Sequence, residues 1–199
     1  MTLPAFATPP DADALVAGLE RSAPARTAYT EVRWSGLLER PLILRGELEY
    51  LGPERLAKHV RTPYREDLLV ADGSATVQRG ERKPRSFALG QAPELEGFLR
   101  GFSALLGGDA VTLRRDFTLA ASGDAANWQL QLKPRDSRLA RRMPSIVVDG
   151  AQGEPRCFRT QEADGDLAIV LVDTLATVEL PVRVGRSEVD ALCRGAKKP

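Results

Sequence analysis

The chain has 199 residues, of which 43% are hydrophobic and 28% are charged, and its formal net charge is +1. This composition suits one globular domain with a substantial core. It excludes a basic nucleic-acid-binding protein, because no run of basic residues is interleaved with aromatic ones. No stretch approaches the roughly 18 apolar residues that a membrane-spanning helix needs.

The N-terminal segment has two interpretations. Ala5-Phe6-Ala7 has the small-x-small form of a signal-peptidase site, but no basic leader or long apolar run precedes it. Residues 1–10 are expected to be either the remnant of a secretion signal, removed or lying outside this sequence, or a flexible Pro-rich end. The stretch from Asp11 to Glu20 is predicted to form a helix with Asp11 as its N-cap.

The stretch from Pro41 to Gly73 predicts three short antiparallel strands. Apolar and charged side chains alternate along the first of them, which is the pattern of a strand with one dry face. Turn signals at Gly52-Pro53 and Thr62-Pro63 separate the strands, and Asp72-Gly73 predicts a hairpin after the third. Period-two patterns predict further strands at 29–34, 75–79, 86–89, 110–119, 128–133, 143–148, 156–162, 166–172 and 178–184.

One segment, from Pro93 to Leu106, interrupts the strands, because its apolar residues recur at the spacing of an amphipathic helix. Gly97 and Gly101 lie away from this apolar stripe and either permit a close backbone approach or add flexibility. The hairpin spacing predicts an antiparallel barrel or half-barrel, with the two helices on its concave face. The stripe is then either ordinary core or the inner face of a lid over an apolar cavity.

Little in the sequence indicates catalysis. The one histidine, His59, is expected to face solvent, and no nucleophile or acid stands at a recognisable spacing from it. The Asp-Gly pairs are turn signals without the carboxylate spacing of a calcium loop. We therefore predict no enzyme, no cofactor and no metal site. Cys157 and Cys193 either form one disulfide in an oxidising compartment or remain two free thiols.

Arginines supply the polar candidates. Arg115 is expected on the dry face of its strand, where it meets a carboxylate, lies at a cavity mouth, binds a ligand's polar head, or reaches solvent from the strand end. The basic segments 82–85 and 138–142 are either solvated loops or surfaces that face anionic lipid or a partner.

Several short pieces resemble, in order and spacing, the LolA-like family, the periplasmic carriers of outer-membrane lipoproteins in Gram-negative bacteria. The resemblance covers roughly residues 11–172. Its most telling piece is Leu69-Val70-Ala71-Asp72-Gly73 after the turn at Pro63. The other matching pieces are the first helix, Tyr29-Thr30-Glu31, Gly46-x-Leu48-x-Tyr50, Pro53, Leu56, the mid-chain helix, and the strand with Trp128, Leu130 and Leu132.

This resemblance implies a mainly β fold with a few helices, an unclosed antiparallel half-barrel with a helical lid. It implies one domain over residues 11–185 and a C-terminal tail at 186–199. The expected protein is a monomeric, non-enzymatic periplasmic carrier or chaperone. It would shelter the acyl chains of a lipid or lipoprotein between an inner-membrane donor and an outer-membrane acceptor, with peripheral membrane contact.

We expect the cavity to be lined by Tyr50, Leu56, Leu113, Phe117, Trp128 and Leu130, under a lid face of Leu95, Phe98, Leu99 and Phe102. One position departs from the family. Lipoprotein carriers typically have an arginine before the turn proline that tethers sheet to lid, whereas this chain has Gly52, and the nearby Arg55 is not the matching residue. The alternatives are a carrier of another envelope lipid, such as a pigment or glycolipid, and a protein-interaction or sensor module.

Overall fold

The computed structural model describes residues 10–195, so that the expected N-terminal segment lies almost wholly outside the described residues. The strands are β1 (Ala25–Trp34), β2 (Leu42–Gly52), β3 (Arg55–Thr62), β4 (Glu66–Ala71), β5 (Ser74–Arg79), β6 (Arg85–Ala88), β7 (Phe117–Gly123), β8 (Trp128–Pro134), β9 (Ser145–Ala151), β10 (Glu154–Gln161) and β11 (Leu167–Val172). The helices are α1 (Ala12–Gly18), α2 (Pro93–Leu106), α3 (Ala110–Asp116), α4 (Ser137–Arg142) and α5 (Arg186–Cys193).

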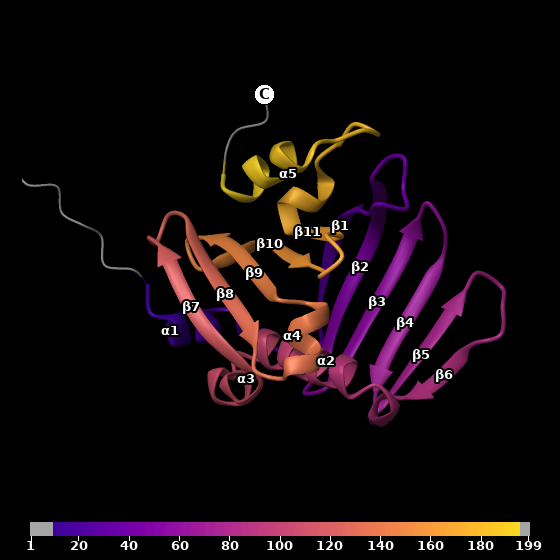
Figure 1. The fold of residues 1–199 in the computed structure, drawn as a ribbon, viewed down its shortest axis with the longest axis horizontal. Coiled ribbons are helices and arrows are strands. Elements are labelled where there is room, and N and C mark those ends of the chain that lie inside the picture. Colours follow the sequence, from indigo (N-terminus) through magenta and orange to yellow (C-terminus); the bar gives the residue numbers. More distant parts are fainter. Residues whose placement is uncertain (1–9, 196–199) are drawn as a thin grey trace, which may run out of the picture.

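All of these strands form one antiparallel sheet, in the order β6-β5-β4-β3-β2-β1-β11-β10-β9-β8-β7. β6 and β7 are the free edges, so the sheet curls without closing, and its two wings rise on either side of the helices (Figure 1). β1 joins the wings by pairing with β2 on one side and β11 on the other. The mainly β half-barrel with helices is therefore confirmed.

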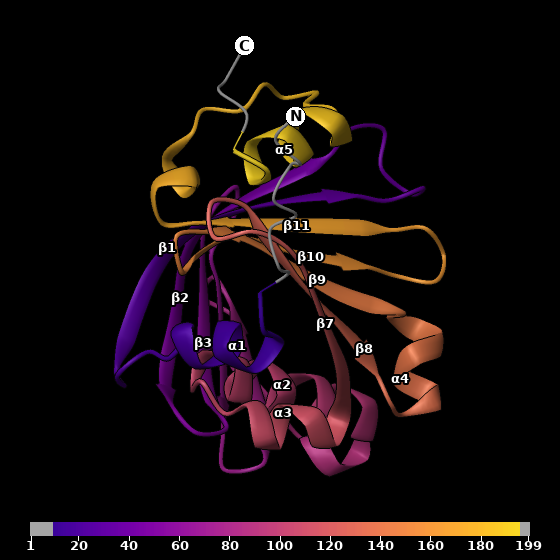
Figure 2. The same ribbon diagram turned by 90° about the vertical axis from the view of Figure 1, so that its left-hand side faces the viewer.

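The helices α1 to α4 cover the concave face. Residues opposite one another in the register share a face, and Tyr29 of β1 lies opposite both Gly46 and Val172. Tyr29 and Val172 pack in one apolar cluster with Val16 from α1 and Leu105 from α2. In Figure 2, α1, α2 and α3 lie beneath the curved sheet, while α5 lies beyond its outer surface.

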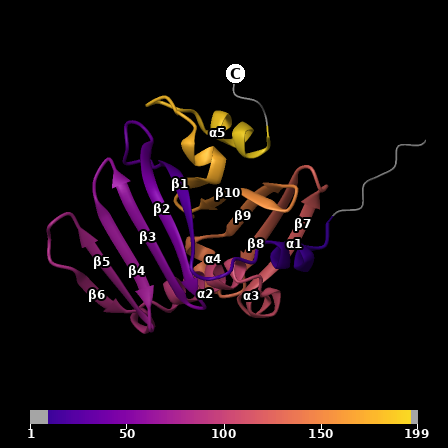
Figure 3. The same ribbon diagram turned by 180° about the vertical axis from the view of Figure 1, so that it is seen from behind.

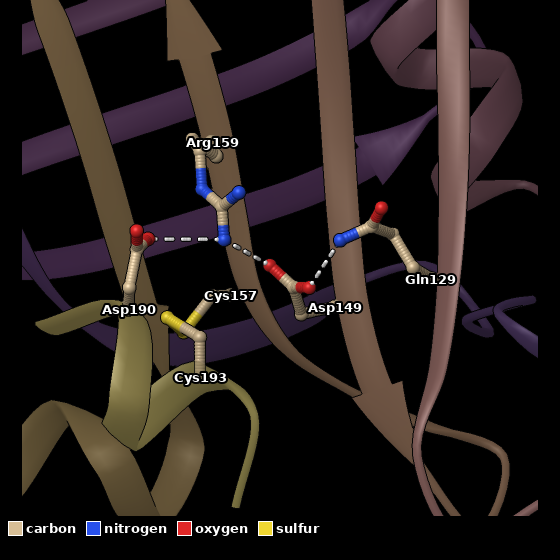
Figure 4. Close-up of a disulfide and its surroundings, with 6 residues drawn as sticks. All are labelled: Gln129, Asp149, Cys157, Arg159, Asp190 and Cys193. Carbon is tan, nitrogen blue, oxygen red and sulfur yellow. Dashed lines mark hydrogen bonds and ion pairs between the residues drawn. A yellow bond between two sulfur atoms is a disulfide. The ribbon is translucent and has the colours of Figure 1, made fainter. Parts of the chain in front are cut away.

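The C-terminal segment packs on the outer face, where an outer cluster comprises Val32, Cys157, Ile169, Leu171, Val184, Val189 and Cys193. Cys157 of β10 and Cys193 of α5 form a disulfide that spans 36 residues of sequence. Beside it, Arg159 donates to the buried Asp149 at 2.9 Å and lies 3.1 Å from Asp190 of α5 (Figure 4). The open question about the cysteines is thus resolved in favour of a disulfide, and α5 is fixed by covalent and ionic contacts.

Several expected elements are confirmed. The three strands of Pro41–Gly73 are β2, β3 and β4, and the amphipathic helix is α2 with the expected bounds. The hairpin around Gly165 joins β10 to β11. Asp11 caps α1, because its carboxylate accepts the Ala14 N–H at 2.8 Å.

Two of the expected strands are wrong, one in part and one in whole. Residues 110–116 form α3 rather than a strand, because Asp109 caps a helix there by accepting the Thr112 N–H at 2.9 Å. Residues 178–184 form no strand, since β11 already pairs on both sides and Val184 instead packs into the outer cluster. Residues 186–193, which were expected within a C-terminal tail, form α5. Among the described residues, no helix is long and apolar enough to cross a bilayer.

We predict that replacing both Cys157 and Cys193 by serine lowers the free energy of unfolding by about 3–4 kcal/mol, because a cross-link of this loop length restricts the unfolded chain. Urea unfolding followed by circular dichroism measures the change. The parent protein under reducing conditions should show the same loss. Equal stability of oxidised parent and double variant would contradict a stabilising role for the bond.

Candidate functional site

The concave side carries two apolar clusters. The central cluster lies under the middle of the sheet and the β7–β10 wing, and its members at 1% exposure or less include Tyr29, Leu105, Leu113, Phe117, Leu130 and Leu132. The edge cluster lies under the other wing and comprises Tyr50, Leu56, Val70, Ala75 and Leu89. The middle of each cluster is therefore packed by buried side chains in this conformation.

The expected lining residues all lie in these clusters, but they do not line one continuous surface. Leu113, Phe117, Trp128 and Leu130 belong to the central cluster, whereas Tyr50 and Leu56 belong to the edge cluster. Leu113 comes from α3 and not from a strand. The expected residues thus lie on the concave side, while their division between two clusters became visible only in the structure.

The expected lid helix, α2, lies against both clusters. Leu95 and Leu99 pack on the edge cluster, Phe98 packs on the central cluster, and Phe102 packs on both. The Phe102 ring meets Phe158 of β10 edge to face, with ring centroids 5.5 Å apart. On its other contact, Phe102 stacks with Phe98, and their centroids are 6.2 Å apart. All four α2 side chains remain half-buried. α2 thus bridges the two wings without being fully enclosed.

The two glycines of α2 differ in their surroundings. A Cβ on Gly101 would lie 2.2 Å from the Phe117 ring, whereas a Cβ on Gly97 would meet no atom within 4 Å. The choice between a close approach and flexibility is thus resolved for Gly101, because α2 can lie this near β7 only without a side chain there.

A hydrogen bond joins α2 to the sheet at the β2–β3 turn. The backbone N–H of Glu54 donates to the Ser103 hydroxyl at 2.8 Å, and Ser103 is 3% exposed. Gly52, at the position of the family's arginine, has φ +121° and no side chain to reach the helix. The turn therefore contacts α2 through its backbone. Sequence reasoning missed Ser103, and its only signal was a small polar residue inside an apolar helix.

A buried ionic cluster also lies on the concave face, and sequence reasoning did not find it. Glu31 of β1 is 3% exposed and pairs with Lys58 of β3 and with Arg33. The Lys58 ammonium lies 5.0 Å from the centre of the Tyr29 ring. Burial alone raises the pKa of Glu31, but Lys58 and then Arg33 outweigh it and hold the pKa below its ordinary value. The signal available in the sequence was Glu31 itself, which follows Tyr29 by two positions and therefore shares its face of the strand.

Tyr29 belongs to the same region. Its hydroxyl is buried and makes no hydrogen bond within residues 10–195. Burial, and then the Glu31 charge, raise the pKa of Tyr29 above its ordinary value, so the phenol stays neutral.

Arg115 does not lie on the dry face of a strand. It is an exposed residue of α3 and lines a pocket between α2, α3 and α4, so its expected place in a strand is wrong. His59 is on the outer face of β3, where Nδ1 lies 2.6 Å from Asp67 and Nε2 lies 3.3 Å from Glu49.

Comparison with known families matches residues 5–196 to the family described as outer membrane lipoprotein carrier protein LolA-like. The chain therefore belongs to this family, which confirms the resemblance noted from its sequence. A search of curated proteins finds no match.

Three solved structures are similar over most of the chain. A LolA superfamily protein from Nitrosomonas europaea is 10% identical, with a TM-score of 0.45 and coverage of 88% of this chain and 96% of that one. The MucA/MucB complex of Pseudomonas aeruginosa is 15% identical, with a TM-score of 0.42 and coverage of 88% and 62%. LprF from Mycobacterium bovis is 11% identical, with a TM-score of 0.37 and coverage of 89% and 100%.

The two α2 glycines form a matched pair of tests. We predict that Gly97→Ala raises the free energy of unfolding by up to about 1 kcal/mol, because alanine favours the helix and meets no neighbour. Gly101→Ala should lower it by about 1–3 kcal/mol, because the added methyl group displaces Phe117. Thermal or urea unfolding measures both. Equal effects at the two positions would contradict the close packing of α2 on Phe117.

A second prediction concerns pH. Because the pKa of Glu31 is lower in the folded chain than its ordinary 4.5, its ion pairs stabilise the fold above pH 4.5, and this contribution is lost as pH falls through the folded-state pKa. Glu31→Gln should lower stability at pH 7 by about 1–3 kcal/mol and flatten its acid dependence. Urea unfolding at pH 7 and at pH 3 measures both, with the exposed Glu81→Gln as control. If Glu31→Gln left the pH dependence of stability unchanged, the ion pairs of Glu31 would not be its source.

Proposed function

We propose that this LolA-like protein binds the acyl chains of a lipid or lipoprotein on the concave side of its sheet. It would shelter them in the periplasm on the way to the outer membrane. The observation that carries the proposal is the apolar stripe of α2, which lies on both concave clusters and yet stays half-buried. A helix placed in this way can exchange its contacts with the sheet for contacts with cargo.

In this conformation the central cluster is well buried. Side chains such as Leu105 and Phe117 fill the central cluster, so cargo enters when α2 moves away from it. Each CH₂ group buried contributes about 0.8 kcal/mol, so an acyl chain of ordinary length offsets the lost contacts of Phe98 and Phe102. Release then requires that the closed and loaded states be close in free energy.

Two features support a periplasmic location and a binding role without catalysis. The disulfide between Cys157 and Cys193 is typical of an oxidising compartment such as the periplasm. The concave face presents apolar side chains and the ion pairs of Glu31. No nucleophile–base pair is found there among the described residues, and this composition suits binding rather than catalysis. A donor in the inner membrane and an acceptor in the outer membrane would complete the route.

The β2–β3 turn at Gly52 bears on the nature of the cargo. Lipoprotein carriers use an arginine before the turn proline, and here Gly52 is followed by a backbone contact from Glu54 to Ser103. This difference favours a release step that does not depend on arginine. Another envelope lipid, such as a glycolipid or pigment, is then as suitable a cargo as a lipoprotein.

The filled central cluster favours a second candidate, a protein-interaction or sensor module on the same fold. In that case the helices are permanent core, and a partner protein binds elsewhere on the half-barrel. The two candidates differ in one property, which is saturable binding of acyl chains.

The decisive experiment is titration with a fluorescent fatty acid, together with native mass spectrometry of protein purified from a bacterial periplasm. We expect saturable binding and co-purifying lipid. Phe98→Asp should weaken binding at least about tenfold, because a charge on the apolar face of α2 opposes an acyl chain. Val111→Asp, on the 71% exposed Val111 of α3, is the matched control and should bind normally.

Circular dichroism of both variants separates binding from folding. If Phe98→Asp unfolds the chain, α2 is permanent core and the module is favoured. Absence of both co-purifying lipid and saturable binding in the parent protein would refute the carrier proposal.

A further inference from the structure

A pocket of about 400 Å³ lies at the helical end of the molecule, between α2, α3 and the β8–α4 connection. These helices gather beneath the sheet, as Figure 3 shows from behind. The charged residues that line the pocket are Arg100, Arg115, Arg135 and Arg138 with Asp116 and Asp136. The concentration of arginines contrasts with the nearly neutral chain as a whole.

Both aspartates of the pocket are already engaged. The Asp116 carboxylate accepts from Arg100 through both oxygens, at 2.8 Å and 3.0 Å. The Asp136 carboxylate caps α4 by accepting the backbone N–H groups of Arg138 and Leu139, at 3.0 Å and 2.8 Å. Among the described residues, neither acid forms an ion pair with Arg115, Arg135 or Arg138.

Three arginines retain donors for a ligand. Arg135 uses its Nε to donate to the Arg114 carbonyl at 2.9 Å, which leaves its two terminal nitrogens. The side chains of Arg115 and Arg138 form no hydrogen bond or ion pair within residues 10–195. A guanidinium group presents a planar fork of donors that matches the oxygens of a phosphate. The pocket thus has the size and donors for one phosphate-bearing group.

The pocket also adjoins the apolar interior. Leu139 lines it, and the same side chain, 6% exposed, belongs to the central cluster. Gly97 of α2 forms another part of the wall, and a Cβ there would meet nothing within 4 Å. Leu139 is therefore the point at which the arginine-lined pocket meets the central cluster.

We infer that this pocket binds the phosphate of a lipid headgroup while the acyl chain of the same lipid lies on the concave face. The inference rests on the proposed acyl-binding function and adds to it the chemical class of the cargo, a phosphate-bearing lipid. Arg115, Arg135 and Arg138 bind the headgroup, and Leu139 separates it from the apolar clusters.

The test compares two lipids that differ only in the phosphate. Oleoyl lysophosphatidic acid and monooleoylglycerol, each below its micelle-forming concentration, compete with the fluorescent fatty acid, and glycerol 3-phosphate supplies the headgroup without the chain. We expect lysophosphatidic acid to bind at least about tenfold more tightly than monooleoylglycerol, because charged hydrogen bonds are stronger than neutral ones. Glycerol 3-phosphate should compete weakly or not at all.

A pair of double variants locates the site. Arg115→Gln with Arg138→Gln should remove the preference for lysophosphatidic acid and leave monooleoylglycerol affinity unchanged. Arg82→Gln with Arg85→Gln removes the same charge from two exposed residues, one in the β5–β6 turn and one at the start of β6, and should keep the preference. Loss of the preference in both double variants would show a general charge effect and overturn the pocket assignment.

The remaining outcomes separate the two proposals. Equal affinity for both lipids overturns the phosphate site and leaves the acyl carrier intact. Competition by glycerol 3-phosphate as strong as that of the lipid overturns the lipid assignment in favour of a soluble phosphate ester. If the parent protein binds neither lipid, the acyl-carrier function fails and the headgroup site fails with it.

Discussion

A single curled sheet has a concave face that no second sheet covers, and the rest of this structure depends on that constraint. Its apolar side chains must be buried by something else in the chain. Four helices, α1 to α4, cover them, and they come from three separate places in the sequence. The C-terminal segment cannot help, because the disulfide holds it on the outer face. The helices on the concave face thus pack on the sheet through non-covalent contacts, whereas the segment on the outer face is also cross-linked to β10 by a disulfide.

The parts of the fold that local patterns determine could be predicted. Strands β2 to β4 alternate clearly, and α2 has a long apolar stripe. α3 could not be recognised, because apolar residues spaced two and four apart, such as Leu113 and Phe117, suit a strand as well as a helix. α5 could not be placed either, since its position depends on Cys157, which lies 36 residues before Cys193 in the sequence.

The candidate site was predictable in its residue types and not in its arrangement. The expected apolar residues lie on the concave side, yet their division between the central and edge clusters follows from contacts between segments that are remote in sequence. The polar contacts were missed because their partners are remote in sequence. Ser103 meets Glu54 across 49 residues, and Glu31 meets Lys58 across 27. Arg115 was misplaced because the strand assigned to it is a helix.

The contact between Glu54 and Ser103 joins a backbone amide to a hydroxyl, and both groups are neutral. Dissolved ions screen interactions between charges and have little effect on such a bond. An arginine at Gly52 would make the same junction responsive to ionic strength and to the negative potential near anionic lipids. The hydrogen bond from Glu54 to Ser103 is therefore insensitive to ionic strength, and it would hold equally in dilute salt and beside a charged surface.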